Sequence, residues 1–244
     1  MVTQSWTYEP APDLDQSLEE RMRHFPRQPD LLVYGFRSLG ALFVRGWLSS
    51  YHRLTITGRE NLPLEKSVVM VANHSSHLDA LCLLSALPLR KLHCAFPAAA
   101  ADYFFQGLPR VCISAVIVNA LPFEREAHIR QSLALCQQLI ANPGNILIIF
   151  PEGKRSTTGA LGRFKPGIGN LLAGKDVLSV PCHIDGAFRS CPKGRFFPRP
   201  SRIHLRIGKA RNYAHLSPSR EASLEIAADL HSAVGALGSS SANY

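Results

Sequence analysis

The chain has 244 residues, of which 46% are hydrophobic, and a formal net charge of +9. This length and apolar content can bury one sizeable core, which argues against two separate domains. The charge is unevenly spread, because residues 1–30 are polar and acidic whereas 13 Lys and Arg between Lys154 and Arg211 face only two Asp. Such a basic surface suits anionic lipid headgroups, phosphorylated substrates or nucleic acid, or is simply a solvated face, and the charge alone does not choose among them.

Cysteine usage indicates a reducing compartment. The six cysteines form no C-x-x-C pair, and most of them lie in apolar runs. This pattern predicts reduced, buried thiols in a cytoplasmic protein. Residues 1–30 show no apolar run typical of a secretory signal peptide, so we expect a polar lead-in there.

Residues 31–53 are expected to form an amphipathic helix on a membrane surface. The segment 31–51 is apolar and aromatic but contains Arg37 and Arg45, and two arginines make a membrane-spanning helix costly. These arginines are eight residues apart and so share one face of a helix, while Trp47 and the leucines cover most of the rest. The pattern is typical of a helix lying in the bilayer interface, and a helix packed on the domain is the alternative.

From Ile56 onward, short apolar runs alternate with helical stretches, which is typical of an α/β domain. We expect a domain spanning residues 54–237, with a central mixed, largely parallel sheet flanked by helices, and a polar tail at 238–244. Strands are predicted at 68–72, 115–118, 145–149 and 177–184, the last interrupted by Pro181, and helices at 129–140 and 217–237. Arg202, His204 and Arg206 alternate with apolar residues, which predicts a half-buried strand with a basic outer face.

A first chemical motif, N-H-S-S-H-L-D at residues 73–79, follows the predicted strand at 68–72. An imidazole has an ordinary pKa near 6.5, so His74 is suited to act as a general base. Ser76 and Asp79 have the form of a capping box, which predicts a helix from about Ser76 to Leu87. Asp79 then lies in the first helical turns, from which its carboxylate can accept the other ring N–H and hold the imidazole in one tautomer.

A second motif, F-P-E-G-K-R-S at residues 150–156, follows the end of another predicted strand. Open α/β sheets bind ligands outside the carboxyl ends of their strands, so this is an expected position for a ligand crevice. Gly153 would let the backbone bend and approach a ligand closely. Glu152 and Arg155 are suited to holding an anionic substrate. The two motifs together therefore predict a site rather than a fold alone.

In these motifs the sequence resembles the glycerol-phosphate and lysophosphatidate acyltransferase family. That family carries an N-H-x-S-x-x-D block, then a segment with Pro or Phe and an Arg, then F-P-E-G-T-R-S, then a short V-P-V-like strand. Here these correspond to residues 73–79, 121–125, 150–156 and 180–182, in the same order. The resemblance covers about residues 56–209. Two departures are that Lys154 stands where the family usually has Thr, and that the second block matches loosely.

The resemblance implies direct transfer of a fatty acyl group from acyl-CoA or acyl-ACP to the free hydroxyl of lysophosphatidate or a related lysolipid, in phospholipid biosynthesis. It implies catalysis by His74 and Asp79 without a covalent intermediate, and no G-x-S-x-G nucleophile motif is present. It also implies that Arg125 shares a phosphate subsite with Arg155, and that Glu152 bonds glycerol hydroxyls or orients Arg155. Neither a metal nor a cofactor beyond the acyl donor is expected. The expected location is the cytoplasmic face of a membrane, peripheral or monotopic.

Three alternatives remain open from the sequence. The acceptor could be a lipid other than a phosphoglyceride. A metal-dependent hydrolase could use His74, His77 and Asp79, completed by His183 and Asp185, although the usual H-x-H-x-D-H spacing is missing. A non-catalytic lipid-binding module is the third. No RNA-binding or zinc-finger pattern supports nucleic acid as a partner.

Overall fold

The computed structural model describes residues 31–100, 119, 121–123, 129–195 and 197–239. Within them an eight-stranded sheet has the order β1-β7-β6-β2-β5-β3-β4, with β8 paired to β6. The strands are β1 Thr55–Thr57, β2 Val68–Ala72, β3 Ala95–Ala100, β4 Leu121–Phe123, β5 Ile146–Ile149, β6 Leu178–Asp185, β7 His204–Ile207 and β8 Arg211–Asn212. Only β7 and β8 run antiparallel to their neighbour β6, so the predicted mixed, largely parallel sheet is confirmed.

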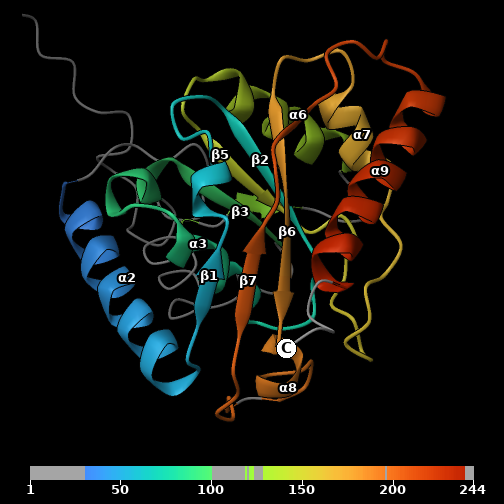
Figure 1. Cartoon of the computed structure of the whole chain (residues 1–244). Coiled ribbons are helices and arrows are strands. Elements are labelled where there is room, and N and C mark those ends of the chain that lie inside the picture. Colours follow the sequence, from blue (N-terminus) through green and yellow to red (C-terminus); the bar gives the residue numbers. More distant parts are fainter. Residues whose placement is uncertain (1–30, 101–118, 120, 124–128, 196, 240–244) are drawn as a thin grey trace, which may run out of the picture.

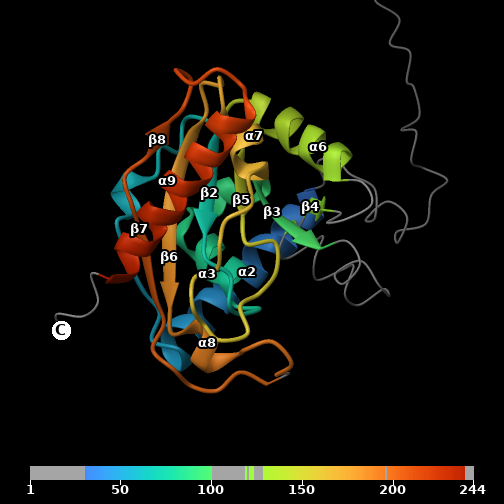
Figure 2. The ribbon, with the colours of Figure 1, turned by 90° about the vertical axis from the view of Figure 1, so that its right-hand side faces the viewer.

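Helices cover both faces of this sheet, which makes a three-layer arrangement (Figures 1 and 2). One face packs against α2 and α3, and the other against α6, α7 and α9. The helices are α2 Leu31–Tyr51, α3 Asp79–Ala86, α6 Ile129–Ala141, α7 Gly167–Leu172, α8 Ala187–Ser190 and α9 Arg220–Ser239, with 3-10 turns η1 Arg59–Asn61 and η2 Leu89–Cys94. Alternate residues of β2 point into the two cores, which explains why the strand reads as a continuous apolar run.

Several predicted boundaries differ from the structure. The helix after the first motif begins at Asp79, not near Ser76, because residues 76–78 form a turn in front of it. Strand β6 continues through Pro181, which was expected to interrupt it, because the residues on both sides still pair with β2. Helix α9 begins at Arg220 and continues to Ser239, two residues beyond its predicted end. The predicted strand at 115–118 lies outside the described residues.

The orientation of α2 departs from the expectation for an interfacial helix. Arg37 is only 4% exposed and donates a hydrogen bond from Nη2 to Asn119 Oδ1 at 3.1 Å, and Arg45 donates to the carbonyl of Leu87. The arginines therefore face the domain, whereas the charged face of an interfacial helix would meet lipid headgroups. Its outward side is apolar instead, with four large exposed residues: Phe36, Leu39, Leu42 and Phe43.

Helix α2 is thus both packed on the domain and amphipathic with its apolar face outward. The packing is extensive, since α2 contacts α3 and η2 and Leu48 is completely buried. None of the helices in the part of the chain that the structure describes combines the length and the apolar character needed to cross a membrane. Large apolar residues grouped on the exposed side of one helix, as Phe36, Leu39, Leu42 and Phe43 are, are unusual for a water-facing surface.

Candidate active site

The two motifs meet because β2 and β5 are adjacent parallel strands. Their register pairs Val71 with Ile149, so the residues three positions further along, His74 and Glu152, leave the sheet side by side. Both motifs therefore lie at the carboxyl ends of neighbouring parallel strands, where the ligand crevice was predicted. The tertiary fold brings together His74, Asp79, Glu152, Gly153 and Arg155, whereas Arg125 lies outside the described residues.

The imidazole of His74 is paired with the carboxylate of Asp79. His74 Nδ1 lies 2.9 Å from Asp79 Oδ2, and the two side chains are 16% and 0% exposed. A carboxylate accepts hydrogen bonds, so this contact places the proton of a neutral imidazole on Nδ1. The Nε2 lone pair is then the one available to take a proton from a hydroxyl.

Asp79 is itself held by the turn that precedes α3. Its Oδ2 also accepts the backbone N–H groups of Ser75 at 2.6 Å and Ser76 at 2.8 Å. Ser76 Oγ accepts the N–H of Leu78 and donates to the carbonyl of Cys191 at 2.8 Å. Half of the predicted capping box is thus present, the bond from the Ser76 N–H to Asp79, and this bond orders a turn before the helix and holds the buried carboxylate in place for His74.

Residues of the second motif bind both the backbone N–H and the backbone carbonyl of His74. Glu152 Oε1 accepts the His74 N–H at 2.8 Å, and the N–H of Ser156 donates to the His74 carbonyl at 2.7 Å. The other carboxylate oxygen of Glu152 accepts the N–H of Gly162 at 3.1 Å. Glu152 is therefore a positioning residue for His74 in this arrangement, and its expected contact with glycerol hydroxyls stays a prediction.

Burial and hydrogen bonds have opposite effects on the pKa of Glu152. Burial raises the pKa of the Glu152 carboxyl, and the backbone N–H groups of His74 and Gly162 oppose this rise. Glu152 is 8% exposed, so an unpaired charge here would be costly. The two amide donors make the buried carboxylate acceptable.

Gly153 has a positive φ of 74°, which only glycine adopts readily. A Cβ added there would lie 2.8 Å from Lys165 Nζ, so the side chain of Lys165 crosses close over this turn. Lys154 is exposed, and Arg155 is half-buried on the other side of the turn. The glycine thus gives the sharp turn that separates a surface lysine from an inward arginine.

The guanidinium of Arg155 lies close enough to affect groups of the first motif. Burial first, then Arg155 and His74, lower the pKa of His77 to about 4. Arg155 also lowers the pKa of the Cys191 thiol, against a larger rise that burial causes. Arg155 therefore supplies positive charge to the site that contains His74, as expected of a residue that binds an anionic substrate.

Three contacts of the site were not foreseen from the sequence. The ring of Phe150 stacks on His74, with centroids 4.2 Å apart and planes at 17°. The amide of Asn73 donates to the Ile184 carbonyl at 2.9 Å and accepts its N–H at 2.8 Å, which extends the pairing of β2 with β6. Phe150 and Asn73 belong to the two motifs, and this was the available sequence signal. Their partners, His74 and Ile184, depend on the fold.

The alternative metal centre would consist of His74, His77 and Asp79, completed by His183 and Asp185. Within the described ranges, no group of three or more His, Cys, Asp or Glu side chains is placed to hold a metal ion. His183 is instead packed beneath the end of α9, where a Cβ added at Gly238 would lie 2.7 Å from its Nε2.

A family model described as "Acyltransferase" matches residues 53–185, more than half of the chain. The chain belongs to the acyltransferase family. This match contains both motifs and begins directly after α2. The family resemblance expected from residues 73–79 and 150–156 is confirmed.

Individual relatives agree with this assignment. The chain is 30% identical over 164 residues to a 1-acyl-sn-glycerol-3-phosphate acyltransferase of Chlamydomonas reinhardtii, covering 66% of this chain and 47% of that protein. It is 31% identical over 147 residues to a chloroplastic 1-acyl-sn-glycerol-3-phosphate acyltransferase of Arabidopsis thaliana, covering 59% and 39%. The chain thus spans about half or less of these two relatives.

The fold also matches a solved structure. The crystal structure of the 1-acyl-sn-glycerophosphate acyltransferase PlsC from Thermotoga maritima superposes with a TM-score of 0.65, covering 86% of this chain and 80% of that one. The sequence identity is 22%, so this likeness supports the shared fold.

The lowered pKa of His77 predicts a pH-dependent stability. Between pH 6.5 and about 4 the unfolded chain binds a proton at His77 and the native chain does not, so the free energy of unfolding should fall as the pH is lowered through this range. Urea unfolding at several pH values should show a smaller fall in His77→Asn than in the wild type. The exposed His215 provides the control, since His215→Asn should keep the wild-type dependence. An unchanged dependence in His77→Asn would contradict the prediction.

Proposed function

We propose that this protein is a 1-acylglycerol-3-phosphate O-acyltransferase, which moves a fatty acyl group from acyl-CoA or acyl-ACP to the free hydroxyl of lysophosphatidate or a related lysolipid, in phospholipid biosynthesis. The observation that carries the proposal is the His74–Asp79 pair, fixed by residues 150–156, in a chain of the acyltransferase family. The 1-acyl-sn-glycerol-3-phosphate acyltransferase relatives supply the acceptor class.

His74 acts as the general base. An acceptor hydroxyl becomes a competent nucleophile when Nε2 removes its proton during attack on the thioester carbonyl. The resulting imidazolium keeps its Nδ1–H bonded to Asp79 Oδ2, whose negative charge stabilises it. The proton then passes to the departing thiolate, so the thioester bond breaks as the ester bond forms and His74 returns to its starting state.

Transfer is direct, without an acyl-enzyme intermediate. The hydroxyl of Ser76, two residues after His74, has another role, because Ser76 Oγ binds the Cys191 carbonyl and the Leu78 N–H. The Cys191 thiol is buried, and burial raises its pKa, which disfavours the reactive thiolate. Both facts support a base-catalysed reaction between two bound substrates.

The acceptor phosphate binds at Arg155, with Arg125 as the second expected contact. A guanidinium suits a phosphate because it offers paired N–H donors in one plane. Arg155 is half-buried and affects His77, so it can hold the phosphate beside the base. An acceptor without a phosphate would lose this contact, which favours phosphoglycerides over other lipids.

The apolar face of α2 attaches the protein to the cytoplasmic face of a membrane without crossing it. Phe36, Leu39, Leu42 and Phe43 are 64%, 65%, 52% and 76% exposed. Burial of such side chains in the headgroup boundary is favourable by roughly 25 cal/mol per Å² of apolar area. Acyl chains enter from the bilayer, so this attachment brings the site to its substrates.

Replacing His74 or Asp79 should abolish most of the activity. We expect kcat to fall on the order of 10²–10⁴-fold in His74→Ala, because proton removal is lost, and by a similar factor in Asp79→Asn. Purified proteins would be assayed with acyl-CoA and lysophosphatidate, with circular dichroism confirming the fold and His215→Ala as the control. Near-normal transfer by folded His74→Ala would refute the mechanism.

Replacing Arg155 should affect the acceptor more than the donor. In Arg155→Ala we expect the KM for lysophosphatidate to rise on the order of 10–100-fold, since a charged contact to phosphate is lost, while the KM for the acyl donor changes little. Lys154→Ala is the matched control, because Lys154 is the exposed neighbour and should leave both constants near wild type. An equal rise for both substrates would show that Arg155 is structural.

Membrane attachment can be tested on α2 without removing it. The double variant Phe36→Ser/Phe43→Ser should float with liposomes much less than the wild type, because it removes two rings that are 64% and 76% exposed and belong to neither core. Leu224→Ser on α9 is the control, since Leu224 is 45% exposed on the other side of the sheet. If both variants float like the wild type, another surface makes the contact. Deletion of residues 1–53 is unsuitable, because it would also uncover the core around Leu48.

A further inference from the structure

A cleft of about 410 Å³ lies between α2, β1 and the C-terminal end of α3. Two arginines, two serines and two aliphatic residues line it: Arg45, Ser49, Leu54, Ile56, Arg59 and Ser85. The volume is in the range of small-molecule sites. The cleft can therefore accept a charged headgroup together with part of the molecule that carries it.

Both arginines also bind the end of α3. Arg59 Nη2 donates to the Ser85 carbonyl at 3.2 Å, and Arg45 Nη2 donates to the Leu87 carbonyl. Each guanidinium has five N–H donors, so these bonds leave most of its donors over. Arg45 Nε is buried and has no hydrogen-bond partner among the described residues. The bonds to the end of α3 therefore use only part of the N–H donors of Arg45 and Arg59.

The charge of the cleft is also unbalanced. A helix C-terminus carries roughly half a negative charge, against two full positive charges on the arginines. In the described part of the chain, no carboxylate lies within ion-pair distance of Arg45 or Arg59. Burial first, and then Arg59, lower the pKa of Arg45, as expected for two nearby cations without an anion. An anionic ligand would relieve this repulsion.

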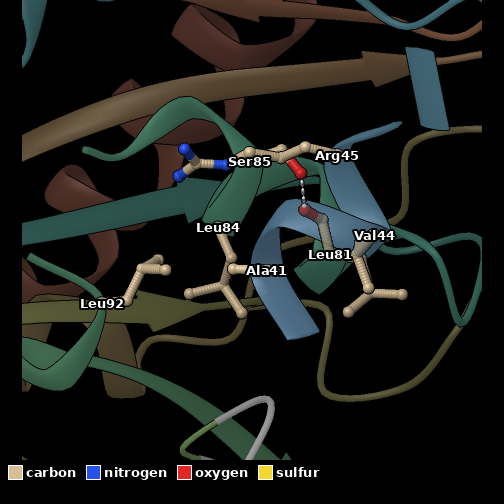
Figure 3. Close-up of a pocket in the computed structure, with 7 residues that line it drawn as sticks. All are labelled: Ala41, Val44, Arg45, Leu81, Leu84, Ser85 and Leu92. Atoms are coloured by element: carbon tan, nitrogen blue, oxygen red, sulfur yellow. Dashed lines mark hydrogen bonds between the residues drawn. The ribbon is translucent and has the colours of Figure 1, made fainter. Parts of the chain in front are cut away.

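The cleft adjoins the exposed apolar side of α2. Ser49, which lines the cleft, follows Leu42 by seven residues, two helical turns, so both lie on the same side of the helix. A smaller crevice between α2 and α3 is lined mainly by aliphatic side chains, and there the guanidinium of Arg45 lies beside Ser85 (Figure 3). Arg45 thus lines both hollows, and Ser49 connects the larger one to the outward apolar side of α2.

We propose that this cleft binds the phosphate headgroup of an anionic phospholipid from the membrane on which α2 lies. Arg45 and Arg59 hold the phosphate oxygens, and Leu54 and Ile56 contact the glycerol unit. The inference rests on the proposed membrane attachment of α2 and adds a specific lipid site to it.

This site is separate from the one that holds the acyl acceptor. Ser85 lies six residues after Asp79 on α3, which is about 9 Å along the helix axis. The free hydroxyl and the phosphate of lysophosphatidate are only a few bonds apart. A phosphate at Arg45 and Arg59 therefore does not present its own hydroxyl to His74, and the bound lipid orients the enzyme on the membrane.

The test uses short-chain phospholipids below their micelle concentration. Isothermal titration calorimetry should show one molecule of short-chain phosphatidylglycerol bound per chain, and much weaker binding of short-chain phosphatidylcholine or inorganic phosphate. Arg45→Gln/Arg59→Gln should weaken phosphatidylglycerol binding by at least about tenfold, since two charge-assisted contacts are lost. Lys209→Gln/Arg220→Gln removes the same charge from exposed positions away from the cleft and should change binding less than about twofold. Equal effects of both double variants would overturn the site, and equal binding of inorganic phosphate would overturn the lipid as its ligand.

Two further measurements keep the outcome decisive. In the unmodified protein, the NMR chemical-shift changes caused by phosphatidylglycerol should concentrate at residues 45–59 and 85–87. Changes concentrated around His74 and Arg155 would contradict the proposal. This measurement does not require the Gln variants to fold. Transfer to short-chain lysophosphatidate in detergent should be unchanged in folded Arg45→Gln/Arg59→Gln. Intact transfer without phosphatidylglycerol binding in the wild type would refute the lipid site alone, whereas absent transfer in the wild type would refute the proposed function.

Discussion

The arrangement of the site depends on how the backbone of His74 is held. A base that sits in a loop needs a fixed main chain before its side chain can have a fixed direction. Glu152 takes the N–H of His74 and Ser156 supplies an N–H to its carbonyl, so both polar groups of this peptide segment are satisfied from the other motif. These two bonds are possible because β2 and β5 are parallel neighbours in a register that ends both strands at the same level. The buried carboxylate of Glu152 is thus better explained by positioning than by substrate binding alone.

Helix α3 then connects the site to the rest of the molecule. At its N-terminal end Asp79 binds the imidazole and two backbone amides, where the positive end of the helix favours a carboxylate. At its C-terminal end Arg45 and Arg59 bind the last carbonyls, where cations are favoured. A helix of eight residues has little stability of its own, so its packing against α2 keeps it in position, and the bonds to His74, Ser75 and Ser76 keep the Asp79 carboxylate in place.

Helix α2 shows how one apolar segment can meet two requirements. Its inner side carries Leu48 into the core and brings Arg37 and Arg45 to specific acceptors, while Phe36 and Phe43 remain outside. A buried arginine is acceptable only with hydrogen-bond partners, and burial lowers the pKa of Arg37 to about 10 even so. The arginines therefore fix the rotation of the helix, and this rotation turns its aromatic residues outward.

The sequence by itself determined the fold class, the two motifs and the family, because hydrophobic periodicity and local residue order are enough to identify strands, helices and a His–Asp spacing across one turn. It also placed Gly153 and Arg155 at a strand end. It could not determine which way α2 is rotated, since the helical spacing of Arg37 and Arg45 is the same whether they face headgroups or the domain. Nor could it assign Glu152 to the backbone of His74, 78 residues away in the chain. Those outcomes depend on the strand order and register of the sheet, which arise from packing between distant segments and leave no mark in the local pattern.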